Sequence, residues 1–330
     1  MKEFPKVPYD LVNAIKNCNR AVICGHVSPD GDCAYSSMAI GLLLDKLGKE
    51  HINVNEGGFD RPELADFSAI VSPSIPEDWL DCNTLGIVVD CSTIDRLGCY
   101  ASYFEKLDIA VIDHHSSGES FGHYRYIVPD SISTTLLVYN VYKACSVDVD
   151  EQAARFIFRG FATDSGFFRF LGADSSPTFN IIAELVKKNI APSTEYHAVN
   201  GNKPFENVKF LATLINRTES LYGGRLMISH EEPEDREKFS DNAKASDDLY
   251  AQLLSVKGTE VVLFFKQSRK VENAVEVGMR ASHFTNIDVG KLAHYFGGGG
   301  HAKASGCTIK GTYEDVRTSV LDKIGEYFAC

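Results

Sequence analysis

The segment from Ile109 to His115 constrains the fold more than any other part of this chain. Its first four residues are apolar, and Asp113, His114 and His115 follow without a break. A continuous run of Val and Ile is expected of a parallel strand that is covered on both faces. Ligands of open α/β sheets gather at the carboxyl ends of such strands. The segment therefore predicts a buried strand that ends at a ligand site, although an ordinary strand-to-loop transition would look the same in isolation.

Two earlier apolar segments also end in polar residues. Residues 20–24 lead into a loop that contains Pro29 and Gly31, and residues 85–89 lead directly into Asp90. Helices are expected over residues 33–47, 133–144, 150–162 and 176–188, with a shorter extended segment at 124–128. Strands that alternate with helices favour an α/β fold with a doubly wound, mostly parallel sheet.

A second unit is expected in the last third of the chain. A connecting helix is predicted over residues 204–221, and it is followed by strand-like segments at 225–230, 260–266 and 274–280 and a helix at 247–256. With about 100–200 residues per domain, a chain of 330 residues is long enough for two. We expect a first domain over residues 1–190, a helical linker over 191–222 and a smaller α/β domain over 223–330.

Composition limits the partners of this protein. The net charge is −12, and no dense basic stripe is present, which disfavours binding to long nucleic acids. No apolar segment approaches the roughly 20 residues of a membrane helix, and the N-terminus lacks the apolar core of a signal peptide. The nine cysteines form no CxxC pair, which is typical of reduced thiols. We therefore expect a cytoplasmic protein with no membrane partner.

Side chains that can bind metal ions follow each of the three predicted buried strands. His and Asp ligands together suit Mn²⁺ and related ions, whereas Mg²⁺ and Ca²⁺ sites are nearly all oxygen. Taken singly, each residue has a simpler explanation as a turn residue or a helix cap. Taken together, they exceed one tetrahedral zinc site and suit two metal ions that share a carboxylate. The candidate ligands are His26, Asp30, Asp32, Asp90, His114 and, after a predicted helix, Asp164.

Four short motifs resemble those of the DHH phosphoesterase superfamily. They are His26-x-x-Pro29-Asp30-Gly31-Asp32, Val88-Val89-Asp90, Asp113-His114-His115 and Thr163-Asp164-Ser165-Gly166. Gly297–Gly300 followed by His301 resembles the glycine-rich loop of the DHHA1 domain. The resemblance runs in order over nearly the whole chain and is greatest for the stand-alone bacterial oligoribonuclease (nanoRNase)/3′-phosphoadenosine-5′-phosphate phosphatase group. That group overlaps with phosphodiesterases of cyclic di-AMP and linear dinucleotides.

This resemblance implies a role for each candidate residue of the first domain. His26, Asp30 and Asp90 would hold one divalent ion, and Asp32, Asp90, His114 and Asp164 would hold the other, so that Asp90 bridges them. Mn²⁺ is the expected metal, with Mg²⁺ and Co²⁺ as alternatives. Asp113 would orient a ligand imidazole, and His115 would face the scissile phosphate or the leaving oxygen. Both are therefore candidate catalytic residues.

The glycine-rich segment is a candidate substrate site in the second domain. Consecutive glycines allow close backbone approach and expose N–H groups to an anion, although a run of glycines alone is typical of a flexible turn. The resemblance implies that Arg280, Gly298, Gly299, Gly300 and His301 grip the far phosphate. Ala281 follows Arg280 here, where the family more often has serine. The basic segment 267–270 resembles one of family II pyrophosphatases, but its position indicates an exposed hairpin turn.

The expected function is hydrolysis of short oligoribonucleotides or dinucleotides and of 3′-phosphoadenosine-5′-phosphate. The alternatives are a cyclic di-AMP phosphodiesterase, an exopolyphosphatase or inorganic pyrophosphatase, and a non-enzymatic nucleotide-binding regulator. The complete ligand set disfavours the last of these, because binding alone does not require two metal ions. The expected partner is a short oligonucleotide or nucleotide, and a homodimer is one option for assembly.

Overall fold

The computed structural model describes residues 3–59, 64–116, 118, 120–201, 203–239 and 245–328. The chain divides into two compact units, Met1–Asn202 and Lys203–Cys330, and each has its own sheet. Among the described residues, no helix combines the length and the apolar character needed to cross a membrane.

A five-stranded parallel sheet forms the centre of the first unit. Its order is β2-β1-β3-β4-β5, and every neighbouring pair is parallel. The strands are β1 (Arg20–Cys24), β2 (Glu50–Val54), β3 (Thr84–Val89), β4 (Asp108–Asp113) and β5 (Tyr124–Ile127). The predicted strands at 20–24, 85–89 and 109–112 are confirmed. The prediction missed β2, because this edge strand carries polar residues at three of its five positions and lacks a continuous apolar run.

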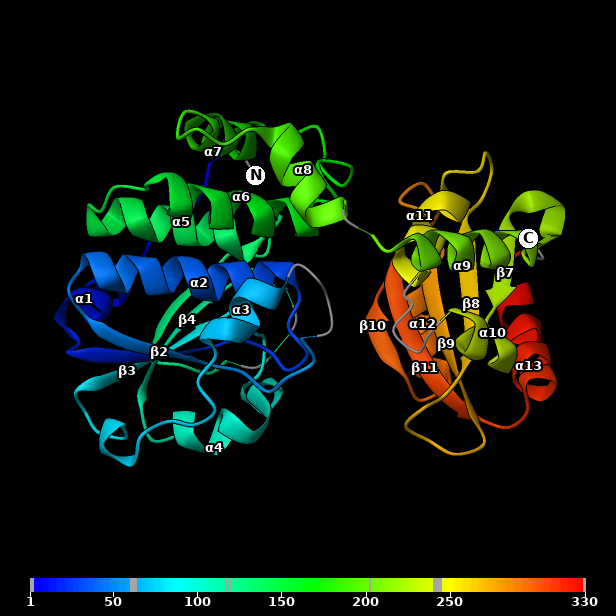
Figure 1. Cartoon of the computed structure of the whole chain (residues 1–330), viewed down its shortest axis with the longest axis horizontal. Helices are drawn as coiled ribbons and strands as arrows, with labels where there is room; N and C mark the ends of the chain where they lie inside the picture. Colours follow the sequence, from blue (N-terminus) through cyan, green and yellow to red (C-terminus); the bar gives the residue numbers. More distant parts are fainter. Residues whose placement is uncertain are drawn as a thin grey trace. The chain divides into compact units, whose positions relative to one another are not determined.

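Alternate residues of the central strands enter two separate cores. Ile23, Ile87 and Ile112 belong to the core on one face of the sheet, and Val22 and Val88 belong to the core on the other. The first face is covered by α1 (Tyr9–Asn17), α2 (Gly31–Lys46), α5 (Thr134–Cys145) and α6 (Glu151–Asp164), and the second by η3 (Ile94–Tyr100) and α4 (Ala101–Phe104) (Figure 1). The sheet is therefore doubly wound, as the apolar runs predicted.

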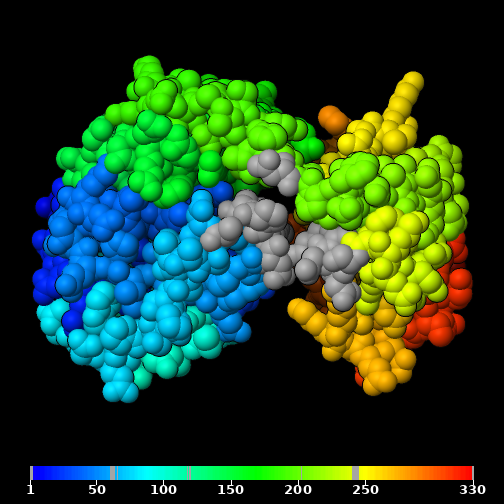
Figure 2. All heavy atoms as spheres, viewed as in Figure 1, coloured from blue at the N-terminus to red at the C-terminus, as the bar shows by residue number. Residues whose placement is uncertain are grey.

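Further short elements complete this unit. They are α3 (Ala65–Ile70), η2 (Glu77–Trp79), α7 (Ser176–Val186) and α8 (Pro192–Asn200). The last two pack against α6 and form part of the outer surface (Figure 2). The buried Glu195 of α8 fixes this contact, because it accepts hydrogen bonds from Arg155 Nε at 3.2 Å and Arg159 Nε at 2.7 Å on α6.

The strand order defines where a ligand site is expected. The chain leaves β1 toward β2 at one edge and then returns past β1 to β3. Such a reversal opens a crevice at the carboxyl ends of the two strands that flank it, where open α/β sheets bind their ligands. In this sheet those strands are β1 and β3, which lead to His26 and to Asp90.

A six-stranded mixed sheet forms the second unit, in the order β10-β11-β9-β8-β7-β6. Only the pair β7–β8 is parallel. The strands are β6 (Glu219–Leu221), β7 (Leu226–His230), β8 (Val261–Gln267), β9 (Ala274–Ala281), β10 (Gly299–His301) and β11 (Ala304–Lys310). One face packs on α9 (Phe205–Asn216), α10 (Pro233–Phe239) and α11 (Ser246–Leu254), and the other on α12 (Val289–Tyr295) and α13 (Tyr313–Gly325). A short helical turn, η4 (Tyr222–Gly224), joins β6 to β7.

The segment 191–222, which was predicted as a helical linker, contains α8 and α9. Helix α8 packs in the first unit, whereas α9 packs against β7, α10 and α11 in the second. The basic segment after β8 lies at the hairpin turn between β8 and β9, which projects from the second unit in orange (Figure 2).

Candidate metal centre

The loop after β1 carries the first three candidate ligands. His26 follows the strand, Asp30 caps the N-terminus of α2 by accepting a hydrogen bond from the Cys33 N–H at 3.1 Å, and Asp32 lies in the first helical turn. A Cβ atom at Gly31 would lie 2.5 Å from Thr163 Cγ2 at the end of α6. Only glycine allows this close approach, which brings α6 and its last residue next to the loop.

Asp90 lies between the two histidines of the site. Its Oδ2 lies 3.6 Å from His26 Nε2, and its Oδ1 lies 3.4 Å from His114 Nε2. The side chain is 2% exposed, and Oδ1 also accepts a hydrogen bond from Thr134 Oγ1 at 2.9 Å. Its φ of 53° is left-handed, a conformation that costs a non-glycine residue on the order of 1 kcal/mol. The Asp90 N–H donates a hydrogen bond to the Ile112 carbonyl at 3.0 Å, which holds Asp90 in this conformation.

His26 and His114 both direct Nε2 toward Asp90. His26 Nδ1 lies 2.9 Å from the Val27 carbonyl, and His114 Nδ1 lies 3.1 Å from the Ser131 carbonyl. A carbonyl oxygen only accepts hydrogen bonds, so each Nδ1 carries a proton and leaves Nε2 as the free ligand atom. His114 Nε2 also lies 3.3 Å from Asp164 Oδ2.

Asp32 is buried against the N-terminus of α5. Its carboxylate accepts hydrogen bonds from the Thr134 N–H at 2.5 Å, the Thr135 N–H at 3.0 Å and Thr135 Oγ1 at 2.9 Å. Burial and the neighbouring charge of Asp90 nevertheless raise the pKa of Asp32 to about 7. Burial and the charge of Asp32 also raise the pKa of Asp164 well above its ordinary value.

The clustered carboxylates repel one another, and a bound positive charge relieves this repulsion. Burial lowers the pKa of His26, but hydrogen bonds to Asp30 and Asp90 outweigh it and raise that pKa to about 10. The protein therefore stabilises positive charge at this position. Four carboxylates and two neutral imidazoles carry a formal charge of −4, which two divalent cations neutralise. The donor set fits two metal ions.

The candidate ligands form overlapping groups. Ligand atoms of Asp32, His114 and Asp164 lie within 4.8 Å of one another, as do those of Asp90, His114 and His115. His26 forms a third such group with Asp90 and Cys33, a residue that the sequence analysis did not include. Asp30 Oδ1 lies 3.8 Å from His26 Nε2. All six predicted metal ligands therefore lie in one cluster.

Asp113 has a different partner from the expected one. Its Oδ1 lies 2.7 Å from His115 Nδ1 and also accepts the backbone N–H groups of His114 and His115 at 2.8 and 3.2 Å. Asp113 thus orients His115, whereas the Ser131 carbonyl orients the imidazole of His114. The hydrogen bond to Asp113 raises the pKa of His115.

An aromatic segment follows Asp164 directly. Gly166, Phe167 and Phe168 all have left-handed φ values of 54°, 54° and 74°. Phe170 is 45% exposed, and the Arg169 guanidinium lies 5.5 Å from the centre of its ring. Sequence reasoning missed this surface, although three phenylalanines within six residues of a candidate ligand are a visible signal.

The candidate substrate residues of the second unit lie side by side on its sheet. Arg280 of β9 pairs with Ala304 of β11, which pairs with His301 of β10, so the three side chains share one face. The Arg280 guanidinium lies 4.6 Å from the ring of Tyr250 and donates a hydrogen bond to the Met279 carbonyl at 3.0 Å. Arg280 and His301 are two strand spacings apart, or about 10 Å.

The glycine-rich segment is partly a strand. Gly299–His301 form β10 at the sheet edge, Gly297 lies in the turn that follows α12, and Gly298 connects that turn to the strand. Gly298 approaches β11 so closely that a Cβ atom would lie 2.3 Å from the Gly306 carbonyl oxygen. A Cβ atom at Gly299 would meet nothing within 4 Å, so the space beside this residue is open.

Family models match both units of the chain. Residues 20–161 match the N-terminal domain of the DHH family, and residues 228–329 match the DHHA1 domain. The bifunctional oligoribonuclease and PAP phosphatase NrnA of Thermus thermophilus is 28% identical over 310 residues, or 92% of this chain and 89% of that protein. The protein of the same name from Bacillus subtilis is 24% identical over 91% of this chain and 92% of its own length.

Solved structures show the same fold. An exopolyphosphatase-related protein from Bacteroides fragilis superposes with a TM-score of 0.84 at 21% identity and covers 98% of both chains. The exonuclease RecJ bound to manganese superposes with a TM-score of 0.54 at 12% identity, over 98% of this chain and 95% of that one.

Proposed function

Because this chain belongs to the DHH family and has a DHHA1 domain, we propose that it is a two-metal phosphoesterase that hydrolyses short oligoribonucleotides and 3′-phosphoadenosine-5′-phosphate. The observation that carries the proposal is the position of Asp90 between His26 and His114, with the other carboxylates around it. Curated relatives that align over about nine-tenths of this chain are named for these two activities.

We infer that both metal ions are Mn²⁺, because the donors mix imidazole nitrogen with carboxylate oxygen. His26, Asp30 and Asp90 would hold one ion, and Asp32, Asp90, His114 and Asp164 the other. When bound, such a pair supplies a hydroxide nucleophile at neutral pH and neutralises charge on the phosphate.

His115 is the proposed general acid. Its Nδ1 is held by Asp113, so the proton on Nε2 is the one directed to the leaving oxygen. Asp113 acts as a positioning residue, because it fixes the ring and favours its protonated form.

The second unit supports a nucleotide substrate in preference to inorganic phosphate chains. Arg280 on β9 and His301 on the edge strand β10 share one face of the sheet, on either side of Ala304, and this pair of basic side chains suits a second phosphate. In the first unit, the exposed ring of Phe170 offers a stacking surface for a base. The net charge of −12 disfavours long polyanions, so the substrate is short.

We further propose a cytoplasmic location, since the eight described cysteines are all free thiols. A homodimer stays a prediction, to be tested by light scattering of the full-length chain.

A substrate panel with Mn²⁺ tests the proposal. It contains RNA of two to five nucleotides, 3′-phosphoadenosine-5′-phosphate, cyclic di-AMP, polyphosphate and pyrophosphate, with Asp90→Ala as the inactive control. We expect turnover of the dinucleotide and of 3′-phosphoadenosine-5′-phosphate that the control lacks. Preferential cleavage of pyrophosphate or polyphosphate would contradict the proposed substrate class, and absence of any turnover would contradict the proposed enzyme.

A further inference from the structure

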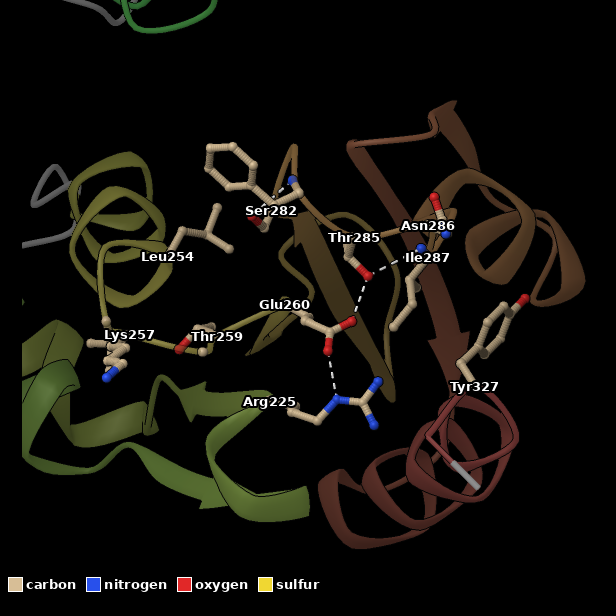
Figure 3. A pocket seen from close by; sticks show the side chains of 13 residues that line it. Arg225, Leu254, Lys257, Thr259, Glu260, Ser282, Thr285, Asn286, Ile287 and Tyr327 are labelled. Carbon is tan, nitrogen blue, oxygen red and sulfur yellow. Dashed lines mark hydrogen bonds and ion pairs between the residues drawn. The ribbon is translucent and has the colours of Figure 1, made fainter. Parts of the chain in front are cut away.

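The second unit contains a pocket that the proposed reaction does not use. It has a volume of about 730 Å³ and lies where β7 and β8 begin and β9 ends (Figure 3). Cavities of several hundred Å³ are the size class of small-ligand sites. Neither Arg280 nor any residue of Gly298–His301 lines it. We call it the Arg225 pocket.

Arg225 is held in place on two sides. Its Nε donates a hydrogen bond to Glu260 Oε1 at 2.5 Å, and its guanidinium lies 4.9 Å from the centre of the Phe328 ring. Glu260 is itself fixed, because its other oxygen accepts a hydrogen bond from Thr285 Oγ1 at 2.5 Å (Figure 3). Side-chain freedom has therefore already been lost before any ligand arrives, which favours binding.

The two terminal nitrogens of Arg225 remain available. Within the described parts of the chain, neither Nη1 nor Nη2 has a hydrogen-bond or ion-pair partner. A guanidinium fork of this kind binds the oxygens of a phosphate in bidentate geometry. Glu260 does not compete for the fork, because it bonds at Nε.

A second cation adds to the positive charge of the pocket. Lys257 lines it and is exposed, and its ammonium group has no ion-pair partner among the residues described. The pocket thus holds two cations and one carboxylate, in a chain whose net charge is −12. A local positive charge on an acidic protein selects an anionic ligand.

Aromatic side chains line the same pocket. Phe284 is 100% exposed, although burial of a phenylalanine side chain stabilises by about 1.5–3 kcal/mol. Its backbone lies in a hydrogen-bonded turn, because its N–H donates to Ser282 Oγ at 3.2 Å and the Thr285 N–H donates to the Ser282 carbonyl at 3.3 Å. Tyr327 provides a second ring on the pocket wall (Figure 3). A fully exposed ring on such a turn suits stacking with a planar ligand.

We propose that the Arg225 pocket binds a nucleoside monophosphate, with its phosphate on the Nη fork of Arg225, its base against Phe284, and Lys257 adding positive charge from the other side of Glu260 (Figure 3). Phosphate or an apolar compound alone would use only half of the pocket. A nucleoside monophosphate is also the product released when a short oligoribonucleotide is cleaved, so the pocket senses product. This last step rests on the proposed function, whereas the binding does not.

Equilibrium dialysis of labelled AMP against the full-length Asp90→Ala/Arg280→Ala protein separates this pocket from the metal centre and from the candidate phosphate site on β9. We expect one bound AMP per chain. In the same background, Lys257→Ala should weaken binding about threefold, and Phe284→Ala at least about fivefold. Both side chains are exposed, so neither substitution disturbs the core. With Asp90 intact, both variants should hydrolyse bis(p-nitrophenyl) phosphate at the unsubstituted rate.

Two substitutions serve as matched controls. Lys310→Ala removes an exposed lysine at the opposite end of the sheet, and Phe205→Ala removes a phenylalanine that is 65% exposed on α9. Neither should change AMP binding. No bound AMP, an equal loss in the controls, or inorganic phosphate bound as tightly as AMP would each overturn the proposal. None of these outcomes depends on turnover, so a failure of the proposed function would be seen separately in the substrate panel.

Discussion

Above pH 10, substitution of Asp90 by asparagine should make the metal-free protein more stable, and at any pH it should destroy the metal centre. Asparagine keeps the shape of the side chain, and its Oδ1 can still accept the hydrogen bond from Thr134 Oγ1. It also tolerates the left-handed φ of 53° better than other non-glycine residues. The new amide nitrogen would face His26 Nε2, which lies 3.6 Å from the present Oδ2.

The gain in stability comes from relief of charge repulsion. The pKa of Asp32 is raised from an ordinary 3.8 to about 7, first by burial and then by Asp90. A carboxyl group whose pKa is higher in the folded state binds its proton more tightly there, so stability falls as pH rises from about 4 to 7. At pH 8 the full difference corresponds to a cost on the order of 4 kcal/mol. Burial persists in Asp90→Asn, so relief of the repulsion recovers about 1–2 kcal/mol of that cost. The same substitution removes a hydrogen bond and a charge that raise the pKa of His26 to about 10. This loss lowers stability only where His26 is protonated in the folded protein, so we expect the net gain above pH 10.

Thermal unfolding with and without Mn²⁺ measures both effects. For a unit of this size, about 1–2 kcal/mol raises the metal-free Tm at pH 10.5 by about 3–6 °C. The fall in stability between pH 4 and 8 should also be shallower than in the unsubstituted protein. Mn²⁺ at a hundred times its dissociation constant stabilises the unsubstituted protein by about 2.7 kcal/mol per site, and the variant should lose most of this. A metal-free variant that melts below the unsubstituted protein at pH 10.5, or an unchanged response to Mn²⁺, would refute the reasoning.

The remaining predictions concern catalysis. His115→Ala should retain both metal ions while kcat falls by about 10²–10⁴, and loss of one ion in metal analysis would show that His115 is a ligand. Arg280→Ala should lower kcat/KM for dinucleotides by an amount that corresponds to about 2–5 kcal/mol of lost transition-state stabilisation, while hydrolysis of bis(p-nitrophenyl) phosphate stays unchanged; equal losses on both substrates would contradict a role of Arg280 in substrate binding. For the unsubstituted protein, kcat/KM should fall steeply beyond about five nucleotides, and equal cleavage of a 5-mer and a 25-mer would contradict a site for short substrates. Phe170→Ala should raise KM for dinucleotides by about fivefold or more, with Phe205→Ala as the matched control, and an unchanged KM would remove base stacking from this surface.

Much of the first unit could be predicted because its signals are local. Apolar runs at 20–24, 85–89 and 109–112 are long enough to indicate buried strands without any knowledge of their neighbours. The order of strands and helices then placed the polar residues after these runs at one edge of a parallel sheet. A candidate site of carboxylates and histidines therefore followed from residue type and position alone.

The tertiary structure decided which side chains meet. Asp32 accepts its hydrogen bonds from Thr134 and Thr135, more than a hundred positions away, and no periodicity reports such a contact. The left-handed backbone of Asp90 and the pairing of Asp113 with His115 likewise depend on neighbouring strands and loops. The edge strands β2 and β10 escaped prediction for a related reason, since each is held by pairing to a neighbour and carries no apolar run of its own.

The Arg225 pocket shows the same division between sequence and structure. Its residues come from four separate parts of the second unit, and none belongs to a motif. The sequence by itself determined which residue types were available and which strands were buried, because both depend on composition and spacing along the chain. Only packing decided that Nε of Arg225 is held while its two Nη atoms stay open. This arrangement exists because the fold brings both Glu260 and the Phe328 ring to one guanidinium group.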